Sequence, residues 1–237
     1  MEADAVAYDK LSISQVEKGG KFINELSLAK GDKVLDMGCG TGILTKYIAD
    51  IVGPDGEVVG VDPDAARIEI AVEKYKESGN LHFHVSDSVA GFPNDDQPYY
   101  DVHVSTYVFH WIPNDGKVIY IQKAYKCLKS GGKLAICCPE KMLKDNEKDI
   151  QDFHALTAEG CRDLFQAVGL FNNVVIKTII TPFRFESFEY FRQWYRATAH
   201  QNLEDLDSAY FERFITTEND GKVTWNIPIT NITAFKD

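Results

Sequence analysis

The chain has 237 residues, of which 44% are hydrophobic and 26% charged, and its formal net charge at pH 7 is −11. This length suits one large α/β domain, or one domain with a small appendage, and the composition is typical of a globular protein. The acidic balance disfavours nucleic acid as a partner, because phosphate binding requires a basic surface.

The first residues, MEADAVAYDK, contain neither a basic segment nor an apolar core, so we predict no secretory signal. No apolar run approaches the ~20 residues of a membrane span, so we expect no membrane partner. The five cysteines form no C-x-x-C pair, and their odd number suits reduced thiols. Together these features predict a cytoplasmic protein.

Strand-like and helix-like segments alternate along the first two thirds of the chain, which indicates a parallel sheet. Glycine-containing turns such as GPDG at 53–56 separate them. The predicted strands are 33–37, 57–62, 81–87, 101–106 and 133–138, and the predicted helices are 42–52, 64–79, 115–132 and 157–170.

The alternation of strand-like and helix-like segments ends after residue 170. We predict a long strand at 172–185, helices at 187–200 and 203–218, and a last strand at 222–237. The fold class is therefore α/β, with a doubly wound, Rossmann-like, seven-stranded sheet whose last strand is antiparallel. We expect one domain, 1–237, in which residues 1–30 form an N-terminal lid region and residues 186–220 a small helical cap.

The first predicted strand leads into a glycine-rich turn in VLDMGCGTG, residues 34–42. In doubly wound sheets the ligand lies beyond the carboxyl ends of the strands. A dinucleotide fingerprint, G-x-G-x-x-G, would need its third glycine at Ile43, and the carboxylate of Asp36 would repel a phosphate. S-adenosylmethionine has no phosphate and carries an ammonium and a sulfonium. We therefore predict S-adenosylmethionine as cofactor and S-adenosylhomocysteine as product.

Two further aspartates follow the next two predicted strands. Asp62 lies twenty residues after Gly42 and can accept hydrogen bonds from both ribose hydroxyls, and Asp87 can bind the adenine amino group, with the Ser88 N–H near the ring. The candidate cofactor-binding residues are Asp36, Gly38, Cys39, Gly40, Gly42, Asp62, Pro63, Asp87, Ser88 and Ser105.

The segments VLDMGCGTG, GVDPD, SDSV and LKSGGKL together resemble class I S-adenosylmethionine-dependent methyltransferases, over about residues 10 to 140. YDKLSISQ near the N-terminus, STYVFHWIPN after the fourth strand and the helical insertion are similar to the juvenile hormone acid and trans-aconitate methyltransferases. That resemblance implies methylation of a small carboxylic acid to a methyl ester. It also implies that Tyr8 and Gln15 belong to a lid over substrate and cofactor, although plain packing of this segment is an equal alternative.

Methyl transfer from a sulfonium is an in-line displacement that positioning and desolvation can promote without a metal. A carboxylate acceptor needs no base, whereas an amine must lose its proton. His110 and Trp111 follow the fourth strand. The Trp111 ring can form one wall of the substrate pocket. His110 can bind an acceptor oxygen, act as a base, or serve only as a packing residue. The candidate catalytic residues are His110, Trp111 and Gln15; the candidate substrate-binding residues are Tyr8, Gln15, Tyr107, His110, Trp111 and Trp194.

Other patterns have simpler explanations. Strand alternation accounts for the His82 and His84 pair, so we predict no metal, and it accounts for the adjacent Cys137 and Cys138. The aromatic stripe that includes Trp194 favours core packing, with part of it covering the active-site mouth. Arg192 and Arg196 either clamp an anionic substrate or form a solvated face. Two alternatives to acid methylation stay open, a small-amine N-methyltransferase and a cofactor-binding, non-catalytic partner subunit, and the sequence leaves the oligomeric state open.

Overall fold

The computed structural model describes residues 2–141, 153–199 and 213–237. The helices are α1 (Glu2–Leu11), α2 (Ile13–Glu25), α3 (Ile43–Val52), α4 (Ala65–Lys74), the short 3₁₀ helix η1 (Phe109–Trp111), α5 (Asn114–Cys127), α6 (Ala158–Val168) and α7 (Phe188–Ala199). The strands are β1 (Lys33–Met37), β2 (Glu57–Asp62), β3 (Leu81–Val85), β4 (Tyr100–Thr106), β5 (Leu128–Pro139), β6 (Asn173–Phe185), β7 (Ile215–Thr217) and β8 (Val223–Phe235).

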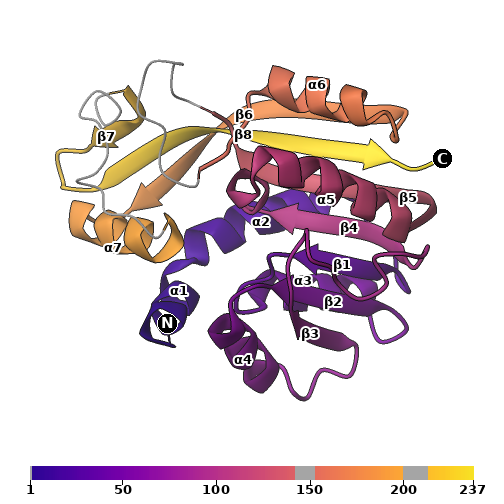
Figure 1. Ribbon diagram of the computed structural model, residues 1–237. Helices are drawn as coiled ribbons and strands as arrows, with labels where there is room; N and C mark the ends of the chain where they lie inside the picture. Colours follow the sequence, from indigo (N-terminus) through magenta and orange to yellow (C-terminus); the bar gives the residue numbers. More distant parts are fainter. Residues whose placement is uncertain (1, 142–152, 200–212) are drawn as a thin grey trace.

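These strands form one mixed sheet in the order β3-β2-β1-β4-β5-β8-β6, and β7 pairs with β8 off this path (Figure 1). The pairs among β1 to β5 are parallel, whereas β8 is antiparallel to both β5 and β6. This confirms the predicted Rossmann-like α/β class with an antiparallel last strand. The chain order reverses between β1 and β4, which makes the carboxyl ends of these two strands the switch point at which such folds bind ligands.

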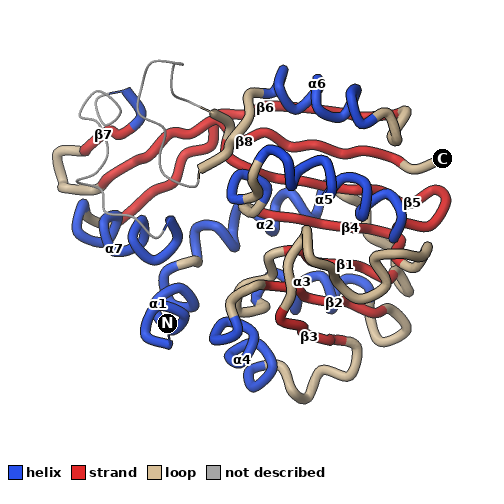
Figure 2. The backbone as a smooth tube through the Cα atoms, viewed as in Figure 1, coloured by secondary structure: helices blue, strands red, loops and turns tan. Residues whose placement is uncertain are grey.

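Helices cover both faces of the sheet (Figure 2). Side chains of α2 and α3 form a core with one face of the sheet, and side chains of α5 and α6 form a second core with the other. Because successive side chains of a strand alternate between the faces, neighbouring residues join different cores. Cys137 belongs to the first core and Cys138 to the second, and all five cysteines are buried and free of disulfide bonds.

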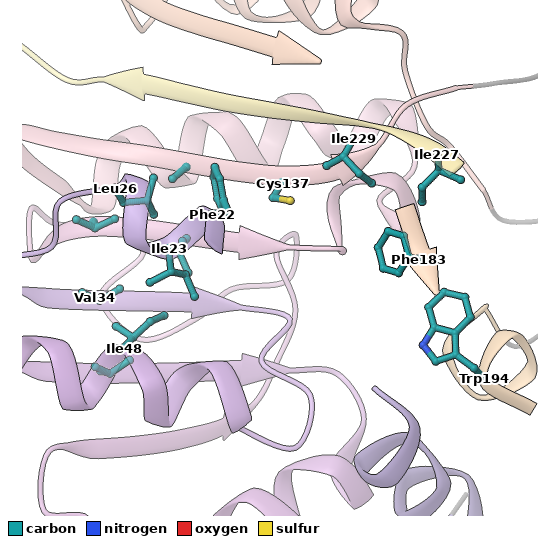
Figure 3. Close-up of a cluster of buried hydrophobic side chains, with 14 of the residues drawn as sticks. Phe22, Ile23, Leu26, Val34, Ile48, Cys137, Phe183, Trp194, Ile227 and Ile229 are labelled. Carbon is teal, nitrogen blue, oxygen red and sulfur yellow. The ribbon is translucent and has the colours of Figure 1, made fainter. Parts of the chain in front are cut away.

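The first core extends from the sheet into the predicted cap region. Figure 3 shows it running from Val34 and Ile48, through Phe22 and Cys137, to Phe183 on β6 and Trp194 on α7. Aromatic rings of the cap stack on one another at centroid distances of 4.8 to 6.2 Å in the contacts among Phe183, Phe185, Phe191, Trp194 and Trp225. Phe191, Trp194 and Tyr195 of the α7 stripe are therefore core, as the spacing favoured, whereas Phe188, the first member of the stripe, is exposed.

Three predicted elements were wrong in their extent. The helix predicted at 64–79 ends at Lys74. The helix predicted at 115–132 ends at Cys127, because Leu128 already pairs with Tyr100 and the following register shift, with Gly131 in the left-handed region, belongs to β5. The helix predicted at 203–218 falls largely outside the described residues, and its last part forms β7, which raises the described sheet from seven strands to eight. Within the described residues no helix is both long and apolar enough to cross a membrane.

Candidate functional site

The glycine turn between β1 and α3 is compact and leaves no room for a side chain at any of its three glycines; at Gly42 a Cβ would lie 2.8 Å from Cζ of Phe83. Gly38, Gly40 and Gly42 all have positive φ, of +80°, +55° and +81°. A Cβ at Gly38 would overlap the side chain of Val108, and a Cβ at Gly40 would lie 2.8 Å from Cε1 of Tyr8. The turn therefore requires glycine for its backbone conformation and for the close approach of its neighbours.

Two buried carboxylates flank this turn. Asp36, on β1, is 1% exposed and accepts a hydrogen bond of 2.8 Å from the Thr45 hydroxyl at the start of α3. Asp62, which ends β2, accepts hydrogen bonds from the backbone N–H groups of Gly40 at 3.0 Å and Asp64 at 2.9 Å. Asp62 thus ties the glycine turn to the end of β2.

Burial raises the pKa of Asp36 to about 7, with a further contribution from the charge of Asp62, although the Thr45 hydrogen bond acts in the opposite direction. Burial also raises the pKa of Asp62, while its two backbone hydrogen bonds and Arg67 oppose the rise. Two neighbouring carboxylates that ionise reluctantly favour a bound cation, because its charge stabilises the ionised forms.

A small cavity of about 30 Å³, partly open to solvent, lies directly against the turn. The Ser12 hydroxyl and the Gln15 side-chain oxygen are buried in this region without a hydrogen-bond partner in the described structure. This glycine-turn cavity is lined by Tyr8, Ser12, Gln15, Val16, Asp36, Gly38, Cys39, Thr41, Ile43, Leu44, Thr106 and Tyr107.

A larger cavity of about 470 Å³ adjoins it on the other side of Gly38, at the ends of β2, β3 and β4. Asp87 forms a local turn there, because its Oδ1 accepts hydrogen bonds from the N–H groups of Val89 and Ala90 at 2.7 and 2.6 Å. This outer cavity is lined by Met37, Gly38, Pro63, Asp87, Ser88, Val89, Val108, Trp111, Ile112, Pro113, Asp115, Gly116 and Ile119.

The N-terminal helix α1 closes over the glycine turn. Tyr8 lies on Gly40, its ring is 4.1 Å from the Arg67 guanidinium of α4, and burial raises the pKa of its hydroxyl to about 12. Asp9 accepts hydrogen bonds of 2.7 and 3.1 Å from the ammonium of Lys74, also on α4. Residues 1–30 accordingly contain two helices that meet the site.

His110 lies apart from both cavities. Its ring is 5% exposed, packs 4.7 Å from Trp111 and 5.0 Å from Phe153, and has an Nδ1 atom without a partner in the described structure. Burial, with the nearby charge of Lys117, lowers the pKa of His110 to about 3, so the ring is neutral at physiological pH. Its assigned role as a base or hydrogen-bonding group stays a prediction.

Lys117, which the sequence analysis did not single out, is fully buried beside this ring. Its ammonium donates to the carbonyls of Ile112 and His154, the latter at 2.7 Å. Burial lowers the pKa of Lys117 to about 8. Its contacts fasten the segment around His154 to the loop that carries Trp111.

Several predicted site residues line neither cavity. Ser105 is in register with Met37 and so faces α5 rather than the glycine turn, whereas its neighbour Thr106 lines the glycine-turn cavity. Trp194 is 4% exposed and packs within the cap. Of the predicted site residues, those that line the glycine-turn cavity are Tyr8, Gln15, Asp36, Gly38, Cys39 and Tyr107. The predicted residues that line the outer cavity are Gly38, Pro63, Asp87, Ser88 and Trp111.

Five polar residues of the site were missed, namely Ser12, Thr41, Thr45, Thr106 and Asp115. Strand alternation could have selected Thr106, because it is in phase with Asp36 across the β1 and β4 pair. Thr45 could have been found from its place in the first turn of α3. No pattern in the sequence indicates Ser12.

This arrangement, a glycine turn flanked by buried carboxylates at the switch point of a 3-2-1-4-5 sheet, is the fold of the class I methyltransferases. Residues 34–132 match the family model described as a methyltransferase domain. The candidate methyltransferase 235L of Invertebrate iridescent virus 6 is 35% identical over 133 residues, which are 56% of this chain and 47% of that protein. The malonyl-[acyl-carrier protein] O-methyltransferase of Acetivibrio thermocellus is 31% identical over 134 residues, 56% of this chain and 45% of that one.

Among solved structures, the chain resembles phosphoethanolamine N-methyltransferase 2 of Haemonchus contortus in complex with phosphomonomethylethanolamine and S-adenosylhomocysteine, with a TM-score of 0.65 and 15% identity. The match covers all of this chain and 57% of that one. The fold is therefore shared at low identity. The chain spans about half the length of the curated relatives it matches. The more specific likeness to juvenile hormone acid and trans-aconitate methyltransferases stays a prediction.

Proposed function

We propose that the chain is an S-adenosylmethionine-dependent methyltransferase that transfers the methyl group to the carboxylate of a small molecule. The observation that carries the cofactor assignment is the pair of buried carboxylates at the glycine turn. Asp36 and Asp62 are held by hydrogen bonds, and both have raised pKa values that a bound cation would bring down.

The residues present fit this cofactor. Asp36 and the glycine turn would hold its methionyl end, Asp62 the ribose hydroxyls, and the outer cavity with Asp87 and Ser88 the adenine. The volume of the outer cavity is ample for one base and its surroundings. When bound, the cofactor supplies an electrophilic methyl group, and the chain has to orient an acceptor in line with it and exclude water.

The acceptor assignment depends on the polar groups around the glycine-turn cavity. Gln15, Ser12 and Tyr107 offer neutral hydrogen-bonding groups there. The unpartnered hydroxyls of Ser12 and Tyr107 and the amide NH2 of Gln15 can donate to a carboxylate, whereas the unpartnered Gln15 oxygen only accepts and suits a donor such as the cofactor's ammonium. No histidine lines this cavity in the part of the chain that the structure describes, and His110 is buried elsewhere. A carboxylate acceptor suits such a site, because it is already ionised and needs no base.

Calorimetry with S-adenosylhomocysteine, followed by methylation of matched panels of carboxylic acids and amines, tests the proposal. We expect saturable binding, ester products and, at saturating cofactor, a rate that is flat from about pH 6 to 9, because an acid with a pKa near ~4 is ionised throughout. Gln15→Ala should raise KM for the acid while leaving cofactor affinity unchanged. The control Gln193→Ala, at an exposed position of α7, should leave both unchanged.

Other outcomes would replace the proposal. Rates on amines that climb steeply with pH, with no ester formed from any acid, would favour the small-amine N-methyltransferase. Binding of S-adenosylhomocysteine without turnover on either panel would favour a non-catalytic partner subunit. Absence of binding would refute the cofactor assignment itself.

A further inference from the structure

Helix α1 is fastened to α4 by two contacts, one of them made by Tyr8, which also lines the glycine-turn cavity. The Arg67 guanidinium stacks 4.1 Å from the ring centroid of Tyr8, and the Lys74 ammonium binds both carboxylate oxygens of Asp9. The partners are adjacent on α1 and two helical turns apart on α4, so the two contacts act on the same stretch of α1. The Asp9 and Lys74 side chains are 26% and 36% exposed.

The same stretch of α1 forms the roof of the glycine turn. The Tyr8 ring lies within van der Waals distance of the space that a Cβ of Gly40 would take, and Tyr8 and Ser12 both line the cavity. With α1 in this position the cavity beside Asp36 is narrow, about 30 Å³, and partly open to solvent. Because Tyr8 and Ser12 of α1 line it, we expect a ligand to enter and leave the space beside Asp36 while α1 is displaced, and α1 to return over the ligand once it is bound.

Burial alone would raise the pKa of the Asp9 carboxyl, but hydrogen bonds from Lys74 and Thr41, together with the charge of Lys74, outweigh it, so the pKa of Asp9 lies below its ordinary value. The carboxylate is thus charged across the physiological range, and the ion pair is complete. Helix α1 packs against α7 as well as against α4.

We propose that Lys74 and Arg67 are positioning residues that latch α1 over the glycine turn and thereby set the rate of cofactor exchange. This inference rests on the proposed cofactor. The latch contacts belong to the closed position of α1, which both the free and the loaded protein adopt. Weakening them raises the fraction of open molecules in both forms, so entry and exit accelerate together and the dissociation constant changes little. An ordinary binding contact would instead alter the dissociation rate alone.

Stopped-flow measurement of S-adenosylhomocysteine binding, followed by the emission of Trp111 and the other tryptophans, tests the latch. Lys74→Gln removes the ammonium from Asp9, and Asp9→Lys places two ammonium groups against each other. An exposed ion pair corresponds to a change of about two- to fivefold, so association and dissociation should each accelerate by about that factor in Lys74→Gln and more in Asp9→Lys. The charge-swapped variant, Asp9→Lys with Lys74→Asp, should return both rates toward wild type.

The matched control is Lys129→Gln, which breaks the ion pair of 2.8 Å between Lys129 and Asp101 near the starts of β5 and β4, at the end of the sheet opposite the glycine turn. Its exchange rates should equal those of the wild type. Hydrogen exchange of the α1 amides gives a readout without any ligand, and it should accelerate in Lys74→Gln and recover in the swapped variant.

The outcomes separate the two ideas. Dissociation that accelerates while association stays constant, or rates that do not respond to either substitution, would overturn the latch. If the wild-type protein does not bind S-adenosylhomocysteine at all, the proposed function fails, and hydrogen exchange still reports whether Lys74 holds α1. Unaltered exchange of α1 in both single variants would overturn the latch by itself.

Discussion

The replacement Asp36→Asn should make the ligand-free protein more stable, by an amount that depends on pH. The ordinary pKa of the side chain is 3.8, and burial raises it to about 7 in the folded protein. Because the folded-state pKa is raised, ionisation destabilises the fold: the cost is absent below pH ~3.8, grows as the pH rises, and is complete above about pH 7. At about 1.4 kcal/mol per pH unit, the full cost is about 4 kcal/mol.

Asparagine keeps the shape and an oxygen that can accept the Thr45 hydrogen bond, but it does not ionise. The constant effects of the replacement, such as a weaker hydrogen bond, do not vary with pH. The stability of Asp36→Asn relative to the wild type should therefore increase by about 2–3 kcal/mol between pH 5 and pH 8. Urea denaturation at pH 5, 6, 7 and 8 measures this difference directly.

Asp55→Asn is a suitable control, because Asp55 is exposed in the turn after α3. Its stability should follow the wild-type curve at every pH. Parallel curves for Asp36→Asn and the wild type would refute the reasoning, because they would show that Asp36 ionises with its ordinary pKa in the folded protein. The same replacement should weaken cofactor binding, so a more stable protein would be a less functional one.

Three further results are expected. Affinity for S-adenosylhomocysteine should fall by about tenfold per pH unit below about pH 7 in titration calorimetry, because the ligand's ammonium favours the ionised Asp36; a flat affinity would contradict this. Gly38→Ala should lower the unfolding free energy by about 2–4 kcal/mol, against about 1 for Gly31→Ala, since both glycines have positive φ but only the first meets a neighbouring side chain; equal losses in thermal melts would count against the steric argument. Asp62→Ala should weaken cofactor binding by about 2–4 kcal/mol, and unchanged affinity would remove Asp62 from the site.

The sequence by itself determined the elements whose pattern is local. Alternating apolar runs and glycine turns located β1, α3 and β2 to within a residue, because period and turn chemistry act over a few neighbours. The acidic residues at the ends of the first three strands were found for the same reason. The carboxyl ends of parallel strands meet at one edge, so Asp36, Asp62 and Asp87 had to lie along one side of the sheet.

Only the tertiary structure decided which side chains enter the cavities. The register between β1 and β4 directs Ser105 to the face of the sheet that α5 covers, and Thr106 to the face that carries the glycine-turn cavity. Packing against Phe153 buries His110 apart from both cavities. The roof over the glycine turn depends on contacts between residues far apart in the chain, such as Asp9 with Lys74, 65 positions later. A local pattern carries no information about such pairs, because they form only when whole helices and strands have packed against one another.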